Sequence, residues 1–333
     1  MCYTGRVMKT HITPNDRFLS TSQMMGGATV VDSISLDDLF NWELASEPVF
    51  DARGHEIPKA ANIVNAGGES LSIMGDVHAL LQPRAFVDMI GTSLEGLNYK
   101  IAFAASMANQ ANYIVGVEII GYNEFSINGE PHRQFQLYSY GASGEIAMVT
   151  APMFERVICS NQFSMMLAGN KACGKAKNTA GGQVRYASMT QELADLLKLR
   201  EQFSGKCDRL GNTLMQYDGA RAFVAGLLAT AGADKLSTRS QNLIRQVVDK
   251  FENGKGCHGK TRYDMFNAFT EHYTHDTANP SAKSFKLKGD PRFGSSLAGR
   301  PAEIKRAALH ALSHDEAFEK TIRRGRVLID TIE

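Results

Sequence analysis

The chain has 333 residues with 43% hydrophobic and 21% charged side chains, an ordinary globular composition with room for two domains. No tract has the bias of a disordered or fibrous protein, and the most apolar uncharged run, 222–233, is too short to cross a bilayer. The net charge of +1 hides an asymmetry, because residues 16–155 hold 6 basic and 17 acidic side chains whereas residues 156–333 hold 28 and 18. The basic half therefore indicates either an anionic partner or an interface with the acidic half, within the chain or between copies.

Short β-rich runs separated by Gly, Pro and Asn dominate the beginning of the chain. These runs are 47–52, 61–65 and 70–75. Two short helices are also expected. One begins at Ser35, where Asp38 three residues later provides a capping signal, and the other covers about 83–90 and is opened by a proline.

From residue 97 onwards the pattern predicts four antiparallel strands in a meander. The strand segments are 97–107, 112–127, 132–140 and 145–151. Asn128-Gly129 favours a type I′ hairpin turn, because both central positions of that turn need positive φ. The third segment carries Phe135, Tyr138 and Tyr140, for which packing in a core is favoured over a stacking platform for bases.

After residue 160 the apolar spacing becomes helical. The predicted helices are 193–214, 220–230, 237–251, 261–275, 301–313 and 315–324. The sequence thus predicts an α+β fold, with an antiparallel β-meander sheet in the N-terminal half and a helical C-terminal half. The predicted domains are an acidic β-rich domain at 1–155 and a basic helical domain at 156–333, with loops at 169–183 and 277–300.

The stretch GKGCHGKT, Gly254 to Thr261, fits the pattern of a phosphate-binding P-loop. A P-loop follows a buried parallel strand, yet apolar residues before this stretch recur every four positions up to Phe251, which indicates a helix. Thr261-x-x-Asp264 is the N-cap signature of a second helix. We therefore interpret the stretch as a helix–loop–helix connection and not as a nucleotide site.

No catalytic set, metal site or cofactor is predicted. His272 and His275, with Cys257 and His258 nearby, have a spacing that zinc permits, but no tight second pair completes four ligands. The chain has no G-x-S-x-G nucleophile elbow, and nothing singles out a Cys/His pair. The protein is expected to act without catalysing a reaction.

The segment 156–191 contains five basic residues, no acid and four glycines. Basic side chains that follow a nucleic-acid backbone, with an aromatic ring for stacking, are what single-stranded nucleic acid binding requires. A solvated surface loop without a ligand is the alternative interpretation. The predicted nucleic-acid-binding residues are Arg156 at the base of the loop, Lys171, Lys175, Lys177, Arg185 and, as the stacking ring, Tyr186.

Cysteine usage and the first residues favour a cytoplasmic protein without a membrane partner. The cysteines are scattered and form no C-x-x-C pair, which favours reduced thiols over a disulfide framework. They are Cys2, Cys159, Cys173, Cys207 and Cys257. The start of the chain lacks the apolar region of a signal peptide.

Three stretches resemble the phage/plasmid-like domain-of-unknown-function family 932. They are SLSIMGDVHALLQP (70–83), ERVICSNQFSMML (155–167) and TRYDMFNAFTEHYTH (261–275). The family has an Arg-Val-Val-Cys-x-Asn-Thr segment after a strand meander, which the second stretch resembles. Its C-terminal Tyr-Asn-Ala-hydroxyl-Glu helix resembles the third. The residues that match are Arg156, Cys159 and Asn161 in the second stretch, and Tyr263, Asn267, Ala268, Thr270 and Glu271 in the third.

The sequence departs from the family in two places. GASGEIA stands where the family has a His-Asp-Gly-Ser turn, and Arg185-Tyr186-Ala187 stands for Arg-His-Thr, so no role of that histidine is carried over. The resemblance implies residence on a phage, prophage or plasmid and no established activity. The order of a meander followed by helices is similar to that of phage single-strand annealing recombinases.

These observations together favour a non-catalytic single-stranded DNA-binding protein of a mobile genetic element, with strand annealing in recombination as a further role. Its expected partners are single-stranded nucleic acid and further copies of the chain. The alternative is a protein-interaction factor that uses its acidic half to antagonise a host defence system by binding a host protein.

Overall fold

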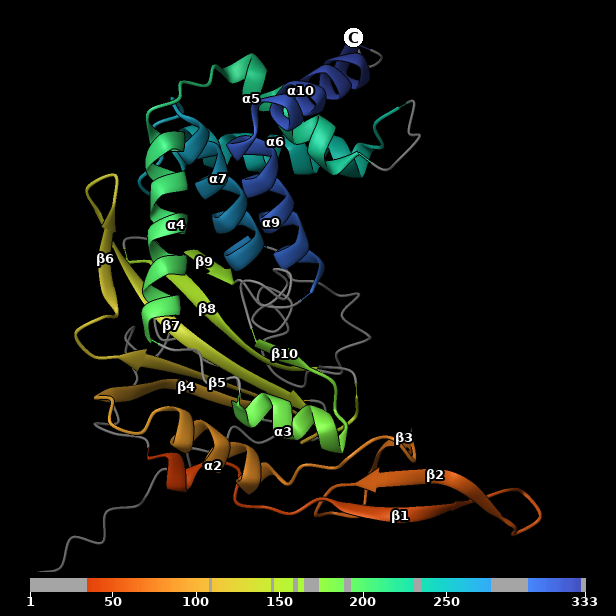
Figure 1. Ribbon diagram of the computed structural model, residues 1–333. Helices are drawn as coiled ribbons and strands as arrows, with labels where there is room; N and C mark the ends of the chain where they lie inside the picture. Colours follow the sequence, from red (N-terminus) through yellow and green to blue (C-terminus); the bar gives the residue numbers. More distant parts are fainter. Residues whose placement is uncertain are drawn as a thin grey trace, which may run out of the picture.

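The computed structural model combines antiparallel sheets in the N-terminal half with a helical C-terminal half (Figure 1), which confirms the predicted α+β class. It describes residues 35–107, 110–144, 147–157, 161–164, 174–188, 193–229, 235–276 and 299–330. Among these residues, no helix combines the length and the apolarity that a bilayer-spanning segment needs.

The larger sheet is the predicted meander with two short additions. Its strands are β4 (Tyr99–Met107), β5 (Asn112–Ile119), β6 (Glu124–Ile127), β7 (Glu130–Gly141), β8 (Met148–Arg156), β9 (Asn161–Ser164) and β10 (Gly174–Ala176). The order is β10-β8-β7-β5-β4, with β6 also paired to β7 and β9 to β8. The single strand predicted at 112–127 is interrupted near Gly121, whose φ is +88°, so β5 and β6 each pair with a different part of β7. Asn128 and Gly129 both have positive φ, as predicted.

The smaller sheet forms an arm that projects from the body of the molecule (Figure 1). It consists of β1 (Ala45–Phe50), β2 (Glu56–Val64) and β3 (Ser70–Gly75), paired in that order. Ser35 and Asp38 form the expected capping box around the short 3₁₀ helix η1 (Leu36–Asp38), and α2 (Pro83–Ser93) follows the arm. Most residues of β1 are exposed, so the arm contributes little to either hydrophobic core.

The C-terminal helices pack around α7. They are α4 (Leu193–Gly211), α5 (Tyr217–Leu228), α6 (Thr238–Asn253), α7 (Arg262–Glu271), α9 (Arg300–Ser313) and α10 (Asp315–Asp330), and a π-helical turn, η2 (His272–Asp276), follows α7. All residues of α7 from Tyr263 to Glu271 are buried, so it is the central helix. The helix α10 crosses α5 at Gly226 and Gly325, where a Cβ on either glycine would collide with a backbone carbonyl of the other helix.

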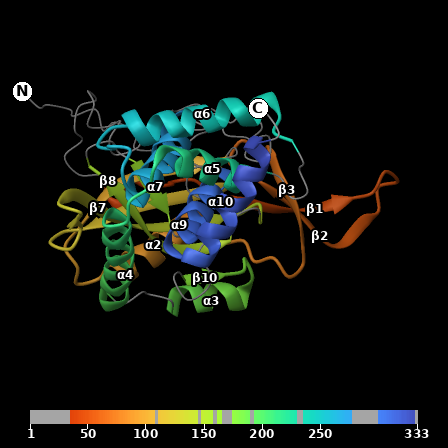
Figure 2. The ribbon, with the colours of Figure 1, turned by 90° about the horizontal axis from the view of Figure 1, so that it is seen from above.

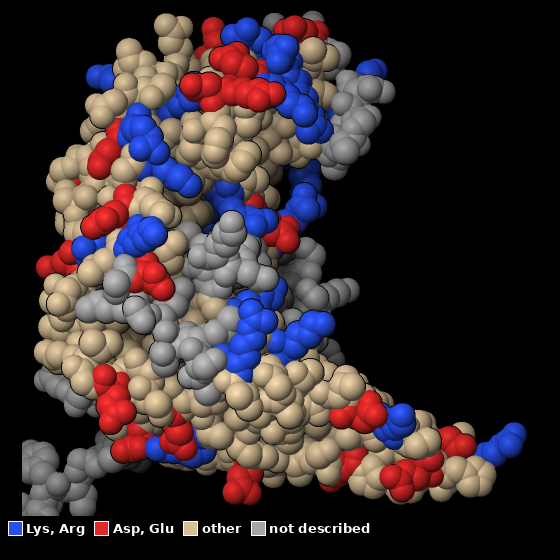
Figure 3. Space-filling model, in the orientation of Figure 1, with Lys and Arg blue, Asp and Glu red and all other residues tan. Residues whose placement is uncertain are grey.

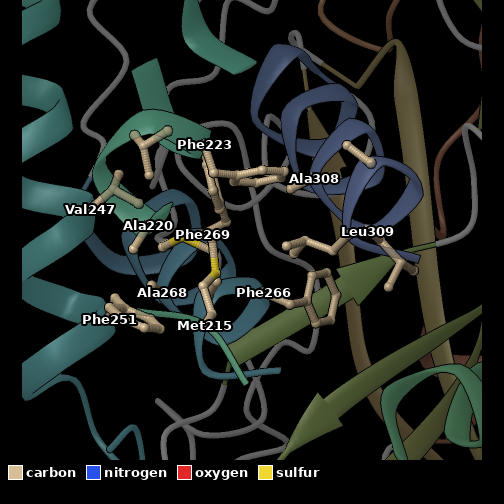
Figure 4. Packing of buried hydrophobic residues seen from close by; sticks show 14 of the residues in the cluster. Met215, Ala220, Phe223, Val247, Phe251, Phe266, Ala268, Phe269, Ala308 and Leu309 are labelled. Carbon is tan, nitrogen blue, oxygen red and sulfur yellow. The ribbon is translucent and has the colours of Figure 1, made fainter. Parts of the chain in front are cut away.

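Two hydrophobic cores lie toward opposite ends of β8. The first joins Phe154 of β8 and Phe163 of β9 to the helices, and Figure 4 shows side chains of α5, α6, α7 and α9 meeting within it. The second contains Met148 of β8, α2, Tyr138 and Tyr140, so the core role favoured for these tyrosines is confirmed. The first core draws on residues from both sides of residue 155, and the division into two domains there stays a prediction. Seen from above in Figure 2, the C-terminal helices α4, α5, α6, α7, α9 and α10 lie together over the larger sheet.

The predicted loop at 169–183 is partly wrong. Its described part contains β10, which pairs with β8, and the beginning of α3 (Ala180–Ser188). The helix forms despite its glycines because the Thr179 hydroxyl accepts a hydrogen bond from the Gly182 amide at the helix start. The predicted loop at 277–300 lies outside the described residues up to 298, and α9 begins at Arg300.

Candidate nucleic-acid interface

Three of the predicted binding residues are exposed on or beside β10 and α3. Lys175 is the middle residue of β10 and is exposed, whereas both of its neighbours in the strand are buried, which is the normal alternation of a strand. Lys177, after the strand, is exposed, and so is Arg185 on α3, which packs against β10. Lys171 lies outside the described residues. Three of the six predicted binding residues are thus presented to solvent on adjoining elements.

Tyr186 is not available as a stacking ring, which corrects the prediction. Only 6% of the residue is exposed, and its hydroxyl donates a hydrogen bond to the carbonyl of Val149 at 3.2 Å. Burial raises the pKa of Tyr186 well above its ordinary value. The physical reason is that this segment forms a helix whose inner face packs on the sheet, so Tyr186 belongs to the second hydrophobic core.

Arg156 is also buried, and its partners belong to the protein. It is 2% exposed at the end of β8, and its guanidinium binds both carboxylate oxygens of Glu130. The same group donates hydrogen bonds to the carbonyls of Lys255 and Gly256 at 2.9 and 2.8 Å and lies 5.8 Å from the ring centre of Tyr263. Arg156 therefore holds the α6–α7 connection against the sheet and does not face a phosphate, contrary to the prediction.

The P-loop-like stretch is the predicted helix–loop–helix connection, because α6 ends at Asn253 and Thr261 caps α7. The amides of Lys260 and Thr261 donate to Oδ2 of Asp264 at 3.1 and 3.0 Å. The amide of Lys255 donates to a carboxylate oxygen of Glu271 at 3.2 Å. Carboxylates of the protein thus accept the hydrogen bonds of backbone amides that a P-loop would direct at phosphates.

Basic side chains gather over β10 and, further up the same face, over α9 (Figure 3). Lys206 of α4 and Arg306 of α9 are exposed and border a cavity between their helices. Neither residue was among the binding residues predicted from the sequence. One sequence pattern could have indicated Lys206. The helix α4 has an exposed polar stripe at four-residue spacing, made of Lys198, Gln202 and Lys206.

Buried titratable groups meet where α7 contacts the sheet. The Tyr263 hydroxyl lies 3.1 Å from Nε2 of His132, and burial raises the pKa of Tyr263 and lowers that of His132. Lys305 of α9 is completely buried, and burial lowers its pKa to about 7. In the described part of the chain, no group of three or more His, Cys, Asp or Glu side chains could hold a metal ion. The contact between Tyr263 and His132 joins α7 to β7 of the sheet.

A family model described as "Domain of unknown function (DUF932)" matches residues 70–308, which span β3 to most of α9. Neither a curated protein nor a solved structure matches the chain.

Proposed function

Because the chain belongs to the family Domain of unknown function (DUF932), whose description assigns no activity, we propose its function from its surface. The protein binds single-stranded DNA without catalysing a reaction, and it anneals complementary strands. It acts as a homo-oligomer in the cytoplasm and originates from a phage, prophage or plasmid.

The observation that supports the proposal is the gathering of exposed basic side chains over β10 and α9 on one face of the molecule (Figure 3). Lys175 lies on β10, Lys177 just after it and Arg185 on α3, whereas Lys206 of α4 and Arg306 of α9 line the cavity between these two helices. All five side chains are exposed. An extended strand that crosses this face can place successive phosphates near both groups of cations. Such contacts depend little on base sequence, because phosphates are common to all sequences. This is the behaviour that a coating or annealing protein needs.

Binding across a salt series tests this proposal. Wild type is titrated against a labelled single strand beside the triple variant Lys175→Ala/Lys177→Ala/Arg185→Ala. Each phosphate contact contributes about 0.7 to the slope of log affinity against log salt, so three lost contacts lower it by about 2. The matched control removes two lysines and one arginine elsewhere, in Arg53→Ala/Lys59→Ala/Lys100→Ala, all of them exposed.

The control should retain the wild-type affinity and slope, because Arg53 and Lys59 lie on or beside the arm and Lys100 lies on β4, at the sheet edge opposite β10. Absence of binding by wild type at low salt contradicts the proposal. Equal slopes for the triple variant and the control place any binding elsewhere on the protein.

The projecting arm favours a second candidate, a protein-interaction factor that antagonises a host defence system. Phe50 and Ile73 on the arm are 56% and 63% exposed, and Val77 just after it is 74% exposed. Acidic residues outnumber basic ones around these apolar side chains. The acids are Glu47, Asp51, Glu56, Glu69 and Asp76, against Arg53 and Lys59. Such a surface suits a basic host protein more than DNA.

Capture of a host protein distinguishes the second candidate from the first. A stoichiometric partner should be retained after nuclease treatment and lost from the variant Phe50→Ser/Ile73→Ser. A partner that nuclease removes, or that the variant retains, counts against the arm as its binding surface.

A further inference from the structure

A cavity of about 160 Å³ lies between α4, β9 and α9. Phe163 and Phe203 contribute rings to its wall, and Leu199 and Leu309 contribute aliphatic side chains. The two rings are stacked with their centres 5.3 Å apart, and Phe203 also stacks on Phe154 at 4.3 Å. Because each ring is held by the next, the apolar wall is preformed and does not depend on a ligand for its shape.

Positive charge lies beside this apolar wall. Lys206 from α4 and Arg306 from α9 are both exposed and both line the cavity, on either side of it. A neutral ligand gains nothing from the two cations beside the cavity. A ligand that joins a flat apolar ring to negative charges satisfies the wall and the rim together. A nucleotide within a single strand has this chemistry, because each base is flanked by two phosphates.

We propose that the cavity receives one unstacked pyrimidine base of the bound strand, while Lys206 and Arg306 neutralise the flanking phosphates. This inference rests on the proposed function and adds to it the group that the protein recognises. The volume favours a single ring, since an apolar cavity of about 150 Å³ holds benzene. The Gln202 amide, exposed on α4 and also lining the cavity, offers a donor and an acceptor to the edge of the base.

Three oligonucleotides of equal length test the inference: oligo-dT, oligo-dA and a strand of abasic sugars. All carry the same phosphates, so differences between them report on the bases. Oligo-dT is expected to bind about tenfold more tightly than the abasic strand, which is the scale of one stacked or enclosed base. Oligo-dA should fall between them, because a purine exceeds the cavity.

Two variants close the cavity by different routes. Leu309→Phe fills it from α9, and Gln202→Trp covers it from the exposed face of α4, where the risk to folding is small. Both should bind oligo-dT only as tightly as the abasic strand, with affinity for the abasic strand unchanged. Lys206→Ala/Arg306→Ala should weaken binding to all three oligonucleotides and lower the salt slope.

The outcomes separate this inference from the function on which it rests. If wild type binds none of the oligonucleotides, the proposed function fails. If it binds all three equally with a steep salt dependence, nucleic-acid binding stands and the base pocket is overturned. Retention of the oligo-dT preference by Gln202→Trp and Leu309→Phe also overturns it, because the base must then lie elsewhere.

Discussion

Replacing Arg156 by alanine is expected to destabilise the protein by about 4 kcal/mol. The guanidinium is buried and donates four hydrogen bonds, two to Glu130 and one each to the carbonyls of Lys255 and Gly256. Bonds to charged groups contribute about 1.5–3 kcal/mol each, so their sum would approach the whole stability of a domain, about 5–15 kcal/mol. Contacts of one side chain are not additive, and loss of one partner of a buried ion pair costs about 3–5 kcal/mol.

Urea unfolding, followed by far-UV circular dichroism and by fluorescence of the single tryptophan, Trp42, measures this loss. Glu130→Ala and the double variant complete a cycle, in which the coupling should be about 1–3 kcal/mol. Lys100→Ala, an exposed cation on β4, serves as the control and should change the free energy of unfolding by less than about 0.5 kcal/mol. A loss below about 1 kcal/mol for Arg156→Ala, or additive single effects, would refute the structural role given to this residue.

Two further predictions follow from the buried groups and the α6–α7 connection. Lys260→Ala should leave nucleotide affinity unchanged, because the adjacent amides already bind Asp264; an ATP hydrolysis that depends on Lys260 and Mg²⁺ would contradict this. Burial lowers the pKa of His132 and His272 below the ordinary 6.5, so the unfolded chain binds protons more readily and the free energy of unfolding should fall as the pH drops below about 6.5. Urea unfolding at about pH 7.5 and about pH 5.5 measures this decrease in the free energy of unfolding. If the variant His132→Asn/His272→Asn loses as much stability between the two pH values as wild type, these histidines are not the source of the decrease.

The parts of the fold that were predicted correctly depend on short-range signals. Asn128-Gly129 specifies its turn through the φ values of two adjacent residues, and Thr261 with Asp264 specifies a helix start within four residues. The same local signal was sufficient to reject the P-loop, because the carboxylate that occupies the loop amides belongs to the capping box itself.

The parts that sequence reasoning missed depend on partners far along the chain. The helix α4 ends at Gly211 and not near residue 214. In its last turn, the carbonyl of Cys207 accepts a hydrogen bond from the side chain of Asn128, which belongs to a turn 79 positions earlier in the chain. Arg156 looked like a surface cation because its partner Gly256 lies 100 positions away. In the candidate site, exposure of Lys175 and Lys177 agreed with the prediction, whereas the burial of Tyr186 depends on a helix that its glycines did not indicate.

Because α5 and α10 cross at Gly226 and Gly325, the position of α10 does not depend on which side chains its outer face carries. Main-chain atoms set the spacing there, since each glycine lies against a carbonyl of the other helix. Lys320, Arg323 and Arg326 of α10 are all exposed, so they do not determine where the helix lies. Tolerance to substitution therefore differs within α10: Gly325 is fixed by the crossing, while the charge of the outer face can be altered with the backbone unchanged.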